Sequence, residues 1–372
     1  MKVLLKFYSE LNLGDDLFLK LILERYPTVD FYLLSDDRYS RNFVTENSFK
    51  NLKIFNDKSD GFLNRLKGYL VRRLLKNKVS SFYKSMLLKT NIDFFKQCDM
   101  FISIGGSIFM EKPLGFFDQD ILYYKVIREY FDKKAIFFIG CNFGPFSNVE
   151  YLKEYKEIFG KAGDVCFRDN YSFNLFKNIE SVRIAPDIVF SLKSFDRQNK
   201  IRNSVGFSVI TTRDLLEEDI YLDKYIKIIK RYLEKEQSVY LFSFCEKEGD
   251  EIMIKRLLEN FKSSKNVIGV FYRGNIKEFL NIYAKVEFMY CSRFHSMILS
   301  MLFEQNIHPI VYSEKMINVL NDISYKGTYT QLKDFVNIDV NAKDHFIENS
   351  YNIEDIKIEA EKHFLNLDKT LS

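Results

Sequence analysis

Residues 286–315 read VEFMYCSRFHSMILSMLFEQNIHPIVYSEK, and this stretch decides how the rest of the chain is interpreted. Its hydrophobic pattern predicts a strand, a loop, a helix and a second strand, at residues 286–290, 291–295, 296–303 and 307–312. Arg293 and His295 therefore lie where a strand gives way to a helix. In open α/β sheets ligands bind at that edge, and the first N–H groups of a helix favour an anion. The stretch predicts an anion site; the alternative is a surface ion pair beside a structural histidine.

The length and composition of the chain predict a globular protein with two domains. It has 372 residues, of which 47% are hydrophobic and 28% charged, and a formal net charge of +4. This length exceeds the usual size of one domain, and the net charge is too small to indicate a nucleic-acid partner. The N-terminus has no signal-peptide pattern, and no run of about 18 apolar residues could span a membrane. We expect a cytoplasmic protein, free or attached to the inner face of the membrane.

The cysteines and other potential metal ligands give no indication of a disulfide framework or a metal site. The five cysteines are odd in number, scattered, and without a CxxC pair, which is typical of a reducing compartment. The sequence shows no converging set of three or four His, Asp or Glu ligands. It therefore predicts no metal and no required cofactor.

Repeated strand–loop–helix units predict a parallel sheet covered by helices in the N-terminal half. The first strand, at residues 3–8, is followed by Asn12, Gly14 and Asp15, which suit a turn and a helix cap. Further strands end in loops with glycines or polar groups: Gly105, Gly106, Ser107, Asn142, Arg168 and Asp187. Because parallel strands point the same way, we expect these residues along one edge of the sheet.

A polar, aperiodic segment at residues 191–203 predicts a boundary, after which a second α/β unit begins. We expect an N-terminal domain at 1–195 and a C-terminal domain at 196–335. A tail at 336–372 is expected to carry a helix that packs back across the domain junction. The fold class is α/β, with two doubly wound Rossmann-like domains facing across a cleft, which is the GT-B-like arrangement.

Residues 61–92 form a strongly basic segment, with eight lysines and arginines and no acidic residue: Arg65, Lys67, Arg72, Arg73, Lys76, Lys78, Lys84 and Lys89. Leucines at helical spacing within it predict a basic amphipathic helix. Such a helix suits an anionic membrane surface or a phosphate, and the alternative is a solvated helix face.

Taken in order, the loop motifs resemble those of the polysaccharide pyruvyl transferase family over roughly residues 1–330. The motifs are Asn12-x-Gly14-Asp15, Ile104-Gly105-Gly106, Gly140-x-x-x-Gly144-Pro145, Arg168-Asp169 with Ser172, Pro186-Asp187, Arg293-x-His295 and Tyr312-x-x-Lys315. The chain departs from the family pattern at Ser107, where a third glycine is usual, and at Asn142, where a serine is usual.

The resemblance implies an enzyme that moves pyruvate from phosphoenolpyruvate, as co-substrate, to a hexose as a ketal. The hexose would belong to a cell-surface polysaccharide (exopolysaccharide or capsule) or to its lipid-diphosphate-linked precursor. The donor carries a carboxylate and a phosphate and needs fixed cations, for which Arg293, Lys315 and Arg168 are the candidates. His295 would act as general acid/base, since an imidazole both gives and takes a proton near neutral pH.

Two aspartates and several loop residues complete the implied site. Asp15 is the candidate to assist catalysis by accepting a proton, and Asp187 is a second; helix capping or loop support is the alternative for both. Acceptor contacts would come from Asn12, Gly14, Gly105, Gly106, Asn142 and Asp187. Two other functions share the fold or the surface: a GT-B glycosyltransferase that uses a nucleotide sugar, and a non-catalytic protein that binds a glycan or lipid precursor.

Overall fold

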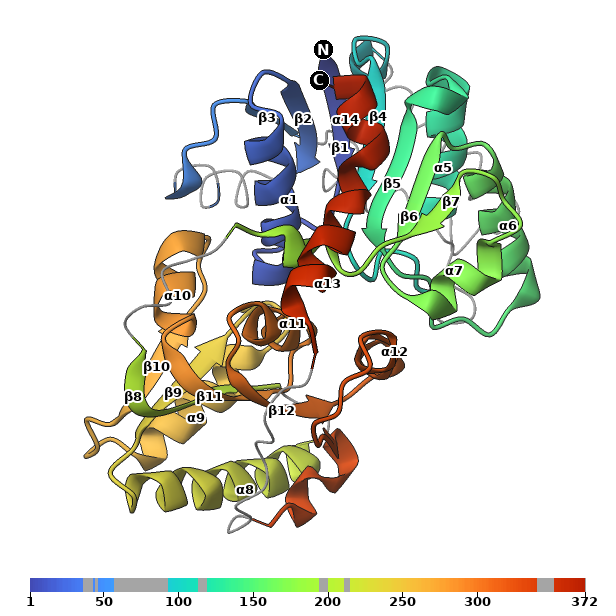
Figure 1. Ribbon diagram of the computed structural model, residues 1–372. Coiled ribbons are helices and arrows are strands. Elements are labelled where there is room, and N and C mark those ends of the chain that lie inside the picture. The colour runs from blue at the N-terminus through green and yellow to red at the C-terminus, as the bar shows by residue number, and fades with distance from the viewer. Residues whose placement is uncertain are drawn as a thin grey trace, which may run out of the picture. The chain divides into compact units, whose positions relative to one another are not determined.

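The chain forms two compact units in the computed structural model, which describes residues 1–35, 43, 46–56, 93–112, 119–193, 200–210, 215–339 and 351–371 (Figure 1). The first unit consists of residues 1–8, 18–185 and 362–372, and the second of residues 9–17 and 186–361. The chain thus enters the second unit after Ala185, upstream of the boundary expected at 195/196. The short segment 9–17, from the expected N-terminal domain, belongs to the second unit.

In the described part of the first unit, seven parallel strands form a doubly wound sheet in the order β3-β2-β1-β4-β5-β6-β7. The strands are Lys2–Lys6 (β1), Asp30–Ser35 (β2), Leu52–Asn56 (β3), Met100–Ile104 (β4), Ile136–Cys141 (β5), Asp164–Phe167 (β6) and Val182–Ile184 (β7). Strand β1 lies between β2 and β4, where Val3 pairs with Phe31 on one side and Met100 on the other. The order of the strands reverses between β1 and β4, and ligands bind at such reversals.

Helices cover both faces of the first sheet because the strand order reverses. They are Leu13–Arg25 (α1), Gln119–Tyr130 (α5), Val149–Gly160 (α6) and Asn170–Phe176 (α7). Right-handed crossovers that run in opposite directions from β1 and β4 place α1 and α5 on opposite faces. The many aromatic residues fill the core on the α5 and α6 side. There the ring of Phe109 lies 5.0 Å from that of Tyr155 and 5.1 Å from that of Phe159, between centroids.

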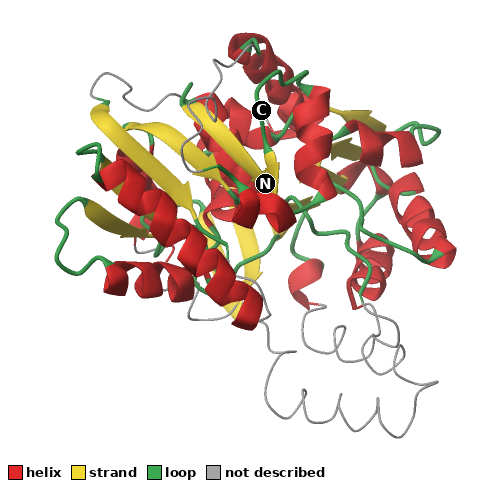
Figure 2. Cartoon of the chain, turned by 90° about the horizontal axis from the view of Figure 1, so that it is seen from below, coloured by secondary structure: helices red, strands yellow, loops and turns green. Residues whose placement is uncertain are grey.

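The second unit holds a second parallel sheet, with the order β10-β9-β8-β11-β12-β13 among its described residues. Figure 2 draws the strands of both sheets in yellow. Its strands are Ile201–Ser208 (β8), Ser238–Ser243 (β9), Val267–Phe271 (β10), Val286–Cys291 (β11), Asn306–Val311 (β12) and Thr330–Gln331 (β13). Its helices are Leu215–Leu233 (α8), Asp250–Asn260 (α9), Ile276–Tyr283 (α10), Phe294–Leu302 (α11) and Glu314–Asp322 (α12). Here the order of the strands reverses between β8 and β11, and β11 is the first strand of residues 286–315.

The C-terminal segment is three short elements, where the tail at 336–372 was expected to carry one helix. These are Ile353–Ala360 (α13), Glu361–Phe364 and Leu365–Leu371 (α14). The first belongs to the second unit, and the other two to the first unit. There Asp368 accepts hydrogen bonds from Arg25 and from the Tyr26 hydroxyl, which is 2.8 Å away. The side chain of Arg183 also donates to the carbonyl of His363, at 2.9 Å, which ties the C-terminus to the first sheet.

Two predicted boundaries are wrong in a way that matters for the site. The loop expected at residues 291–295 ends earlier, because α11 begins at Phe294 and includes His295 in its first turn. Likewise α1 begins at Leu13, so Gly14 and Asp15 lie within the helix and not in the preceding turn. A hydrogen bond from the Gly14 N–H to Asn12 Oδ1, at 3.1 Å, makes Asn12 the polar group at the start of α1.

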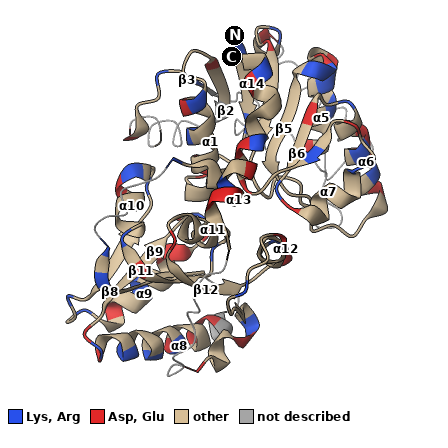
Figure 3. Ribbon diagram, viewed as in Figure 1, with Lys and Arg blue, Asp and Glu red and all other residues tan. Residues whose placement is uncertain are grey.

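Surface charges are mixed in sign, as the small net charge requires. Lysines alternate with glutamates along α6, whereas on α8 the acidic residues come in the first half and the basic residues in the second (Figure 3). All five cysteines are free thiols. Within the described ranges no helix is long and apolar enough to cross a membrane. The basic segment 61–92 lies outside the described residues.

Candidate functional site

The start of α11 is fixed at the reversal between β8 and β11. Ser208, the last residue of β8, accepts hydrogen bonds at its Oγ from the backbone N–H groups of Ser292, at 2.9 Å, and Arg293, at 3.2 Å. The Ser292 hydroxyl donates in return to the carbonyl of Ser208. From inside the unit, the Tyr283 hydroxyl lies 2.7 Å from Ser296 Oγ. These contacts hold the first turn of the helix, and with it His295, on rigid elements.

Arg293 is buried and pairs with two carboxylates, one buried and one partly exposed. Its Nη1 donates to Glu248 and its Nη2 to Asp250, whose side chains are 35% and 0% exposed. Asp250 also accepts from the backbone N–H groups of Phe244, at 2.8 Å, and Cys245, at 3.1 Å. Burial works to lower the pKa of Arg293, but the charges of Asp250 and Glu248 outweigh it and raise that pKa. The guanidinium is therefore a fixed cation with a permanent partner in Asp250.

His295 lies between an aspartate, an aromatic ring and a glycine. Its Nε2 is 3.8 Å from Asp187 Oδ2, and its ring packs edge-on against Phe294 at 5.1 Å between centroids. On another side lies Gly14, where an added Cβ would overlap the imidazole ring. Only 11% of the His295 side chain is exposed. The imidazole is thus confined and has a carboxylate within reach to stabilise its protonated form.

The N-terminal segment 9–17 forms part of this site because it pairs with the β9–α9 connection of the second unit. The Leu13 N–H donates to the carbonyl of Phe244 at 3.1 Å, and Asn12 forms a β-bridge with Cys245. The Asn12 Nδ2 donates to Glu248 Oε1, also at 3.1 Å. Asn12 and Gly14 therefore meet Arg293 and His295 through long-range contacts inside one unit.

Four residues that the sequence reasoning missed hold this arrangement together: Asp16, Glu248, Asp250 and Tyr272. The Tyr272 hydroxyl donates to the buried Asp16 carboxylate at 2.7 Å, which fixes α1 to the end of β10. Glu248 and Asp250 follow β9 in a turn where Gly249 has φ 87°. The sequence could have indicated Glu248 and Asp250 because they are two acidic residues soon after a strand, and ligand-binding groups lie at the ends of parallel strands.

The remaining predicted residues of the second unit lie near the starts of their helices. Asp15 is half-buried in the first turn of α1. Asp187 is 1% exposed and accepts from the Val189 N–H at 2.9 Å, so it caps a short helix as well as facing His295. The Lys315 ammonium, in the first turn of α12, lies 5.5 Å from the ring centroid of Phe294 and 5.4 Å from that of Tyr312. Lys315 is thus next to the first residue of α11.

A second group of predicted residues lies at the carboxyl edge of the first sheet. Arg168, only 4% exposed, donates from Nη2 to Asn142 Oδ1 at 2.6 Å, and the Ser107 hydroxyl donates to the same oxygen at 3.1 Å. The guanidinium lies against Gly106, where a Cβ would come within 2.6 Å of it. Gly105, with φ 150°, leads into this contact from β4. The group therefore combines a buried cation, a side-chain amide and glycine backbone without side chains.

The predicted site residues are divided between the two units. Asn12, Gly14, Asp15 and Asp187, expected in the N-terminal domain, are in the second unit with Arg293, His295 and Lys315. Arg168, expected with the donor-binding cations, is in the first unit with Gly105, Gly106 and Asn142. The catalytic histidine candidate thus has its neighbours within one unit.

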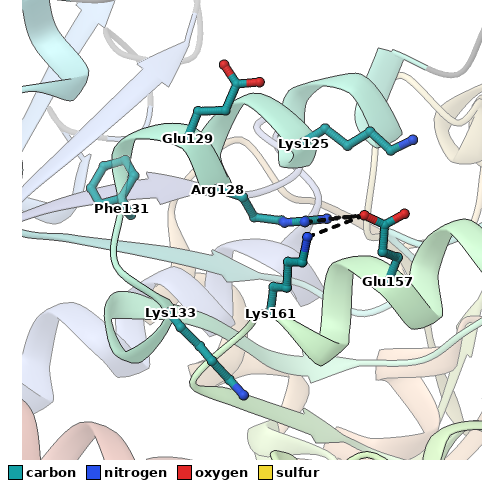
Figure 4. A pocket seen from close by; sticks show the side chains of 7 residues that line it. All are labelled: Lys125, Arg128, Glu129, Phe131, Lys133, Glu157 and Lys161. Carbon is teal, nitrogen blue, oxygen red and sulfur yellow. Dashed lines mark hydrogen bonds and ion pairs between the residues drawn. The ribbon is translucent and has the colours of Figure 1, made fainter.

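A hollow of about 540 Å³ on the first unit lies away from the Arg168 group of that unit (Figure 4). It is lined by Lys125, Arg128, Glu129, Phe131, Lys133, Glu157 and Lys161. Arg128 and Lys161 both reach Glu157, at 3.4 and 3.6 Å. The hollow lies where α5 and α6 end and β5 begins, which is the amino edge of the sheet, whereas active sites of such folds occupy the carboxyl edge.

In the part of the chain that the structure describes, no group of three or more His, Cys, Asp or Glu residues could hold a metal ion.

Solved structures share the fold across almost the whole chain. UDP-GlcNAc 2-epimerase from Methanocaldococcus jannaschii has a TM-score of 0.59 and 11% identity, with 99% of each chain covered. The Anabaena protein Alr3699/HepE in complex with UDP and glucose has 0.53 and 12%, covering 100% of this chain and 99% of its own. UDP-GlcNAc 2-epimerase from Neisseria meningitidis, bound to UDP-GlcNAc, has 0.53 and 9%, covering 99% and 100%. The likeness confirms the predicted α/β architecture of two parallel-sheet domains of GT-B type.

Sequence comparison adds one result that reaches beyond the fold. The family model described as Polysaccharide pyruvyl transferase matches residues 12–314, from the segment that carries Gly14 to the start of α12. No curated protein sequence matches the chain.

Proposed function

Because the chain belongs to the polysaccharide pyruvyl transferase family, we propose that it moves a pyruvyl group from phosphoenolpyruvate to a hexose, releasing phosphate. The acceptor hexose is part of a cell-surface polysaccharide or of its lipid-linked precursor, and the product is a cyclic ketal. The observation that carries the proposal is the position of His295. In a chain matched by this family over residues 12–314, His295 lies at the carboxyl edge of a parallel sheet, between Gly14 and Asp187.

The reaction needs a group that moves protons, and His295 supplies it. One sugar hydroxyl adds to C2 of phosphoenolpyruvate while C3 takes a proton and becomes a methyl group. A second hydroxyl then forms its bond to C2 as the C2–O bond to phosphate breaks, and its proton leaves with the phosphate or a base. His295 as the imidazolium gives the proton to C3, and as the neutral imidazole it then accepts one from a hydroxyl; Asp187 at 3.8 Å stabilises the imidazolium before the first transfer and after the second.

The donor's negative charges need cations on rigid elements, and the second unit offers two. Arg293 is held by the β8–β11 reversal, and Lys315 lies in the first turn of α12, where the helix N-terminus also favours an anion. The proposal assigns these residues to the carboxylate and the phosphate. Asp15, in the first turn of α1, is proposed as a second proton acceptor.

Acceptor recognition is assigned to neutral groups. The Asn142 amide and the backbone of Gly105 and Gly106 suit sugar hydroxyls, which both donate and accept hydrogen bonds. Arg168 holds the Asn142 amide in place through the contact at 2.6 Å. In this proposal, phosphoenolpyruvate is bound by the cations of the second unit.

A lipid-linked acceptor at the inner face of the membrane completes the proposal. Its basis is the basic composition of residues 61–92. Reversing the charges of Arg72 and Arg73 is expected to weaken co-sedimentation with anionic vesicles; unchanged co-sedimentation would remove this part of the proposal.

The transfer reaction itself is tested by incubating the protein with phosphoenolpyruvate and a panel of hexose acceptors. The expected result is phosphate release that depends on an acceptor, with the acceptor gaining the mass of one pyruvyl ketal. Thermal protection by UDP- or GDP-sugars without protection by phosphoenolpyruvate would favour the glycosyltransferase alternative. Acceptor binding without phosphate release from any acceptor would favour a non-catalytic binding protein.

A further inference from the structure

One carboxylate of the chain itself is bound by two N–H donors beside His295. Glu248 receives a hydrogen bond from Arg293 Nη1 on one oxygen and from Asn12 Nδ2, at 3.1 Å, on the other. The two donors are far apart in the sequence, at residues 12 and 293, but contact the same carboxylate. Both donors are tied closely to His295: Arg293 is two residues before it, and Asn12 accepts from the N–H of Gly14, which touches the imidazole.

The two carboxylates on Arg293 differ in how firmly they are held. Asp250 is fully buried and accepts from two backbone N–H groups. If it left, these N–H groups would lose their partner in the interior, and Arg293 would lose a buried counter-charge. Glu248 lies in a turn before α9, its side chain is 35% exposed, and rotation about its side-chain bonds carries it into water. Only Glu248 can be exchanged for another anion at low cost.

If Glu248 rotates away, it leaves a preformed carboxylate site. A guanidinium N–H and an amide N–H would remain aimed at one place, with Asp250 keeping Arg293 charged and in position. The donor of the proposed reaction carries a carboxylate next to its reacting C2 and C3 atoms. A carboxylate bound in place of Glu248 would bring these atoms toward His295, which the proton transfer to C3 requires.

We infer that Glu248 occupies the subsite for the donor's carboxylate, formed by Arg293 and Asn12, and that the donor displaces it on binding. This inference rests on the proposed function. It moves Asn12 from the acceptor to the donor and makes Glu248 an internal competitor that sets the affinity for phosphoenolpyruvate.

The test is calorimetric binding of three ligands to the full-length wild-type protein and to Glu248→Ala. Phosphoenolpyruvate and pyruvate carry the carboxylate, whereas inorganic phosphate does not. Removing the competitor is expected to tighten binding of both carboxylates by about threefold, the scale of a partly exposed ion pair, and to leave phosphate unchanged. Glu248→Gln, which keeps the shape of the side chain, shifts affinity in the same direction and covers the case in which the alanine variant does not fold.

Glu246→Gln is the matched control, since it removes one negative charge from an exposed residue of the same turn, whose charge acts on Arg273. It should leave all three affinities within about twofold, as expected for an exposed charge. Equal tightening in this control would mean that net charge, and not the subsite, sets affinity, and would overturn the inference.

Other results separate the inference from the proposed function. Unchanged or weaker binding of phosphoenolpyruvate and pyruvate to both Glu248 variants overturns the inference, even if transfer proceeds; weaker binding would indicate that Glu248 only positions Asn12. Tighter carboxylate binding in a protein that never releases phosphate supports the subsite and overturns the transfer reaction.

Discussion

The carboxyl edges of the two sheets bury an arginine to a similar extent but surround it differently. Arg293, 9% exposed in the second unit, contacts two carboxylates close to an imidazole. Arg168, 4% exposed in the first unit, contacts an amide oxygen and a glycine. The second edge thus contains groups that can carry protons and balance charge, and the first contains groups suited to neutral hydroxyls. Under the proposed function, proton transfer belongs to the second unit and sugar recognition to the first.

The largest expected effect is on the second edge, from His295→Ala. Loss of the general acid/base should lower the rate of phosphate release by about 100-fold or more, with little change in stability. His308→Gln is the control, because His308 is also a buried histidine of the second unit and its ring bonds to Thr330, at 2.8 Å. Near-normal turnover by His295→Ala would show that the proton chemistry lies elsewhere.

The next effect comes from Gly14→Ala, in which the new methyl group must displace the imidazole of His295. We expect a loss of about tenfold or more in kcat, since small misplacements of a catalytic group are costly. Alanine is a better helix former than glycine by about 1 kcal/mol, so helix stability cannot explain a loss.

Gly160→Ala in α6 is the matched control for that variant, because a Cβ there meets no atom within 4 Å. Its activity should stay within about twofold of wild type. Equal activities of the two alanine variants would contradict the placement of Gly14 against His295.

At the carboxyl edge of the first sheet, the expected effect is smaller and concerns acceptor binding instead of the rate of the chemical step. Arg168→Lys removes the planar donor that holds Asn142 Oδ1 and should raise the KM for the hexose acceptor by about fivefold. The KM for phosphoenolpyruvate should not change. A rise confined to the phosphoenolpyruvate KM would reverse the assignment and make Arg168 a donor-binding residue.

The smallest expected effect is on stability at acid pH, again in the first unit. Burial works to raise the pKa of Asp120, but the charges of Lys6, 2.5 Å away, and Lys112 outweigh it and lower that pKa to about 2. The pair therefore stabilises the fold above about pH 4 and loses that contribution as pH falls toward 2. Asp120→Asn should lower the free energy of unfolding at pH 7 by about 1 kcal/mol and flatten its fall between pH 4 and 2.

Urea unfolding followed at several pH values measures this contribution. Glu129→Gln, which changes an exposed carboxylate of the same helix, serves as the control and should leave the curve unchanged. An Asp120→Asn variant with the wild-type pH profile would show that this ion pair adds nothing to stability.

The sequence allowed the architecture to be predicted because it depends on local patterns. Strands such as Met100–Ile104 and Val267–Phe271 are short apolar runs bounded by polar loops, and their periodicity is visible without any partner. Arg293 and His295 were also predictable, since a strand followed by a polar loop and an apolar helix places them at the ligand-binding edge.

Long-range pairing was not predictable in the same way. Nothing local to Asn12 or Gly14 shows that this segment bonds to Glu248 and packs on His295, more than 230 residues away. Carboxylates in a turn, such as Glu248 and Asp250, have the composition of solvated residues. The start of α11 was misplaced because Phe294 and His295 fit a loop equally well until Ser208 fixes the preceding backbone.

The proton transfer assigned to His295 can be followed in the reaction of phosphoenolpyruvate with a competent hexose acceptor in D₂O, with NMR of the product. If C3 of the donor takes a solvent-derived proton through His295, the ketal methyl group must carry one deuterium, and His295→Ala must form this product about 100-fold more slowly. A product whose methyl group lacks deuterium, or an unchanged rate of formation in His295→Ala, would contradict the account.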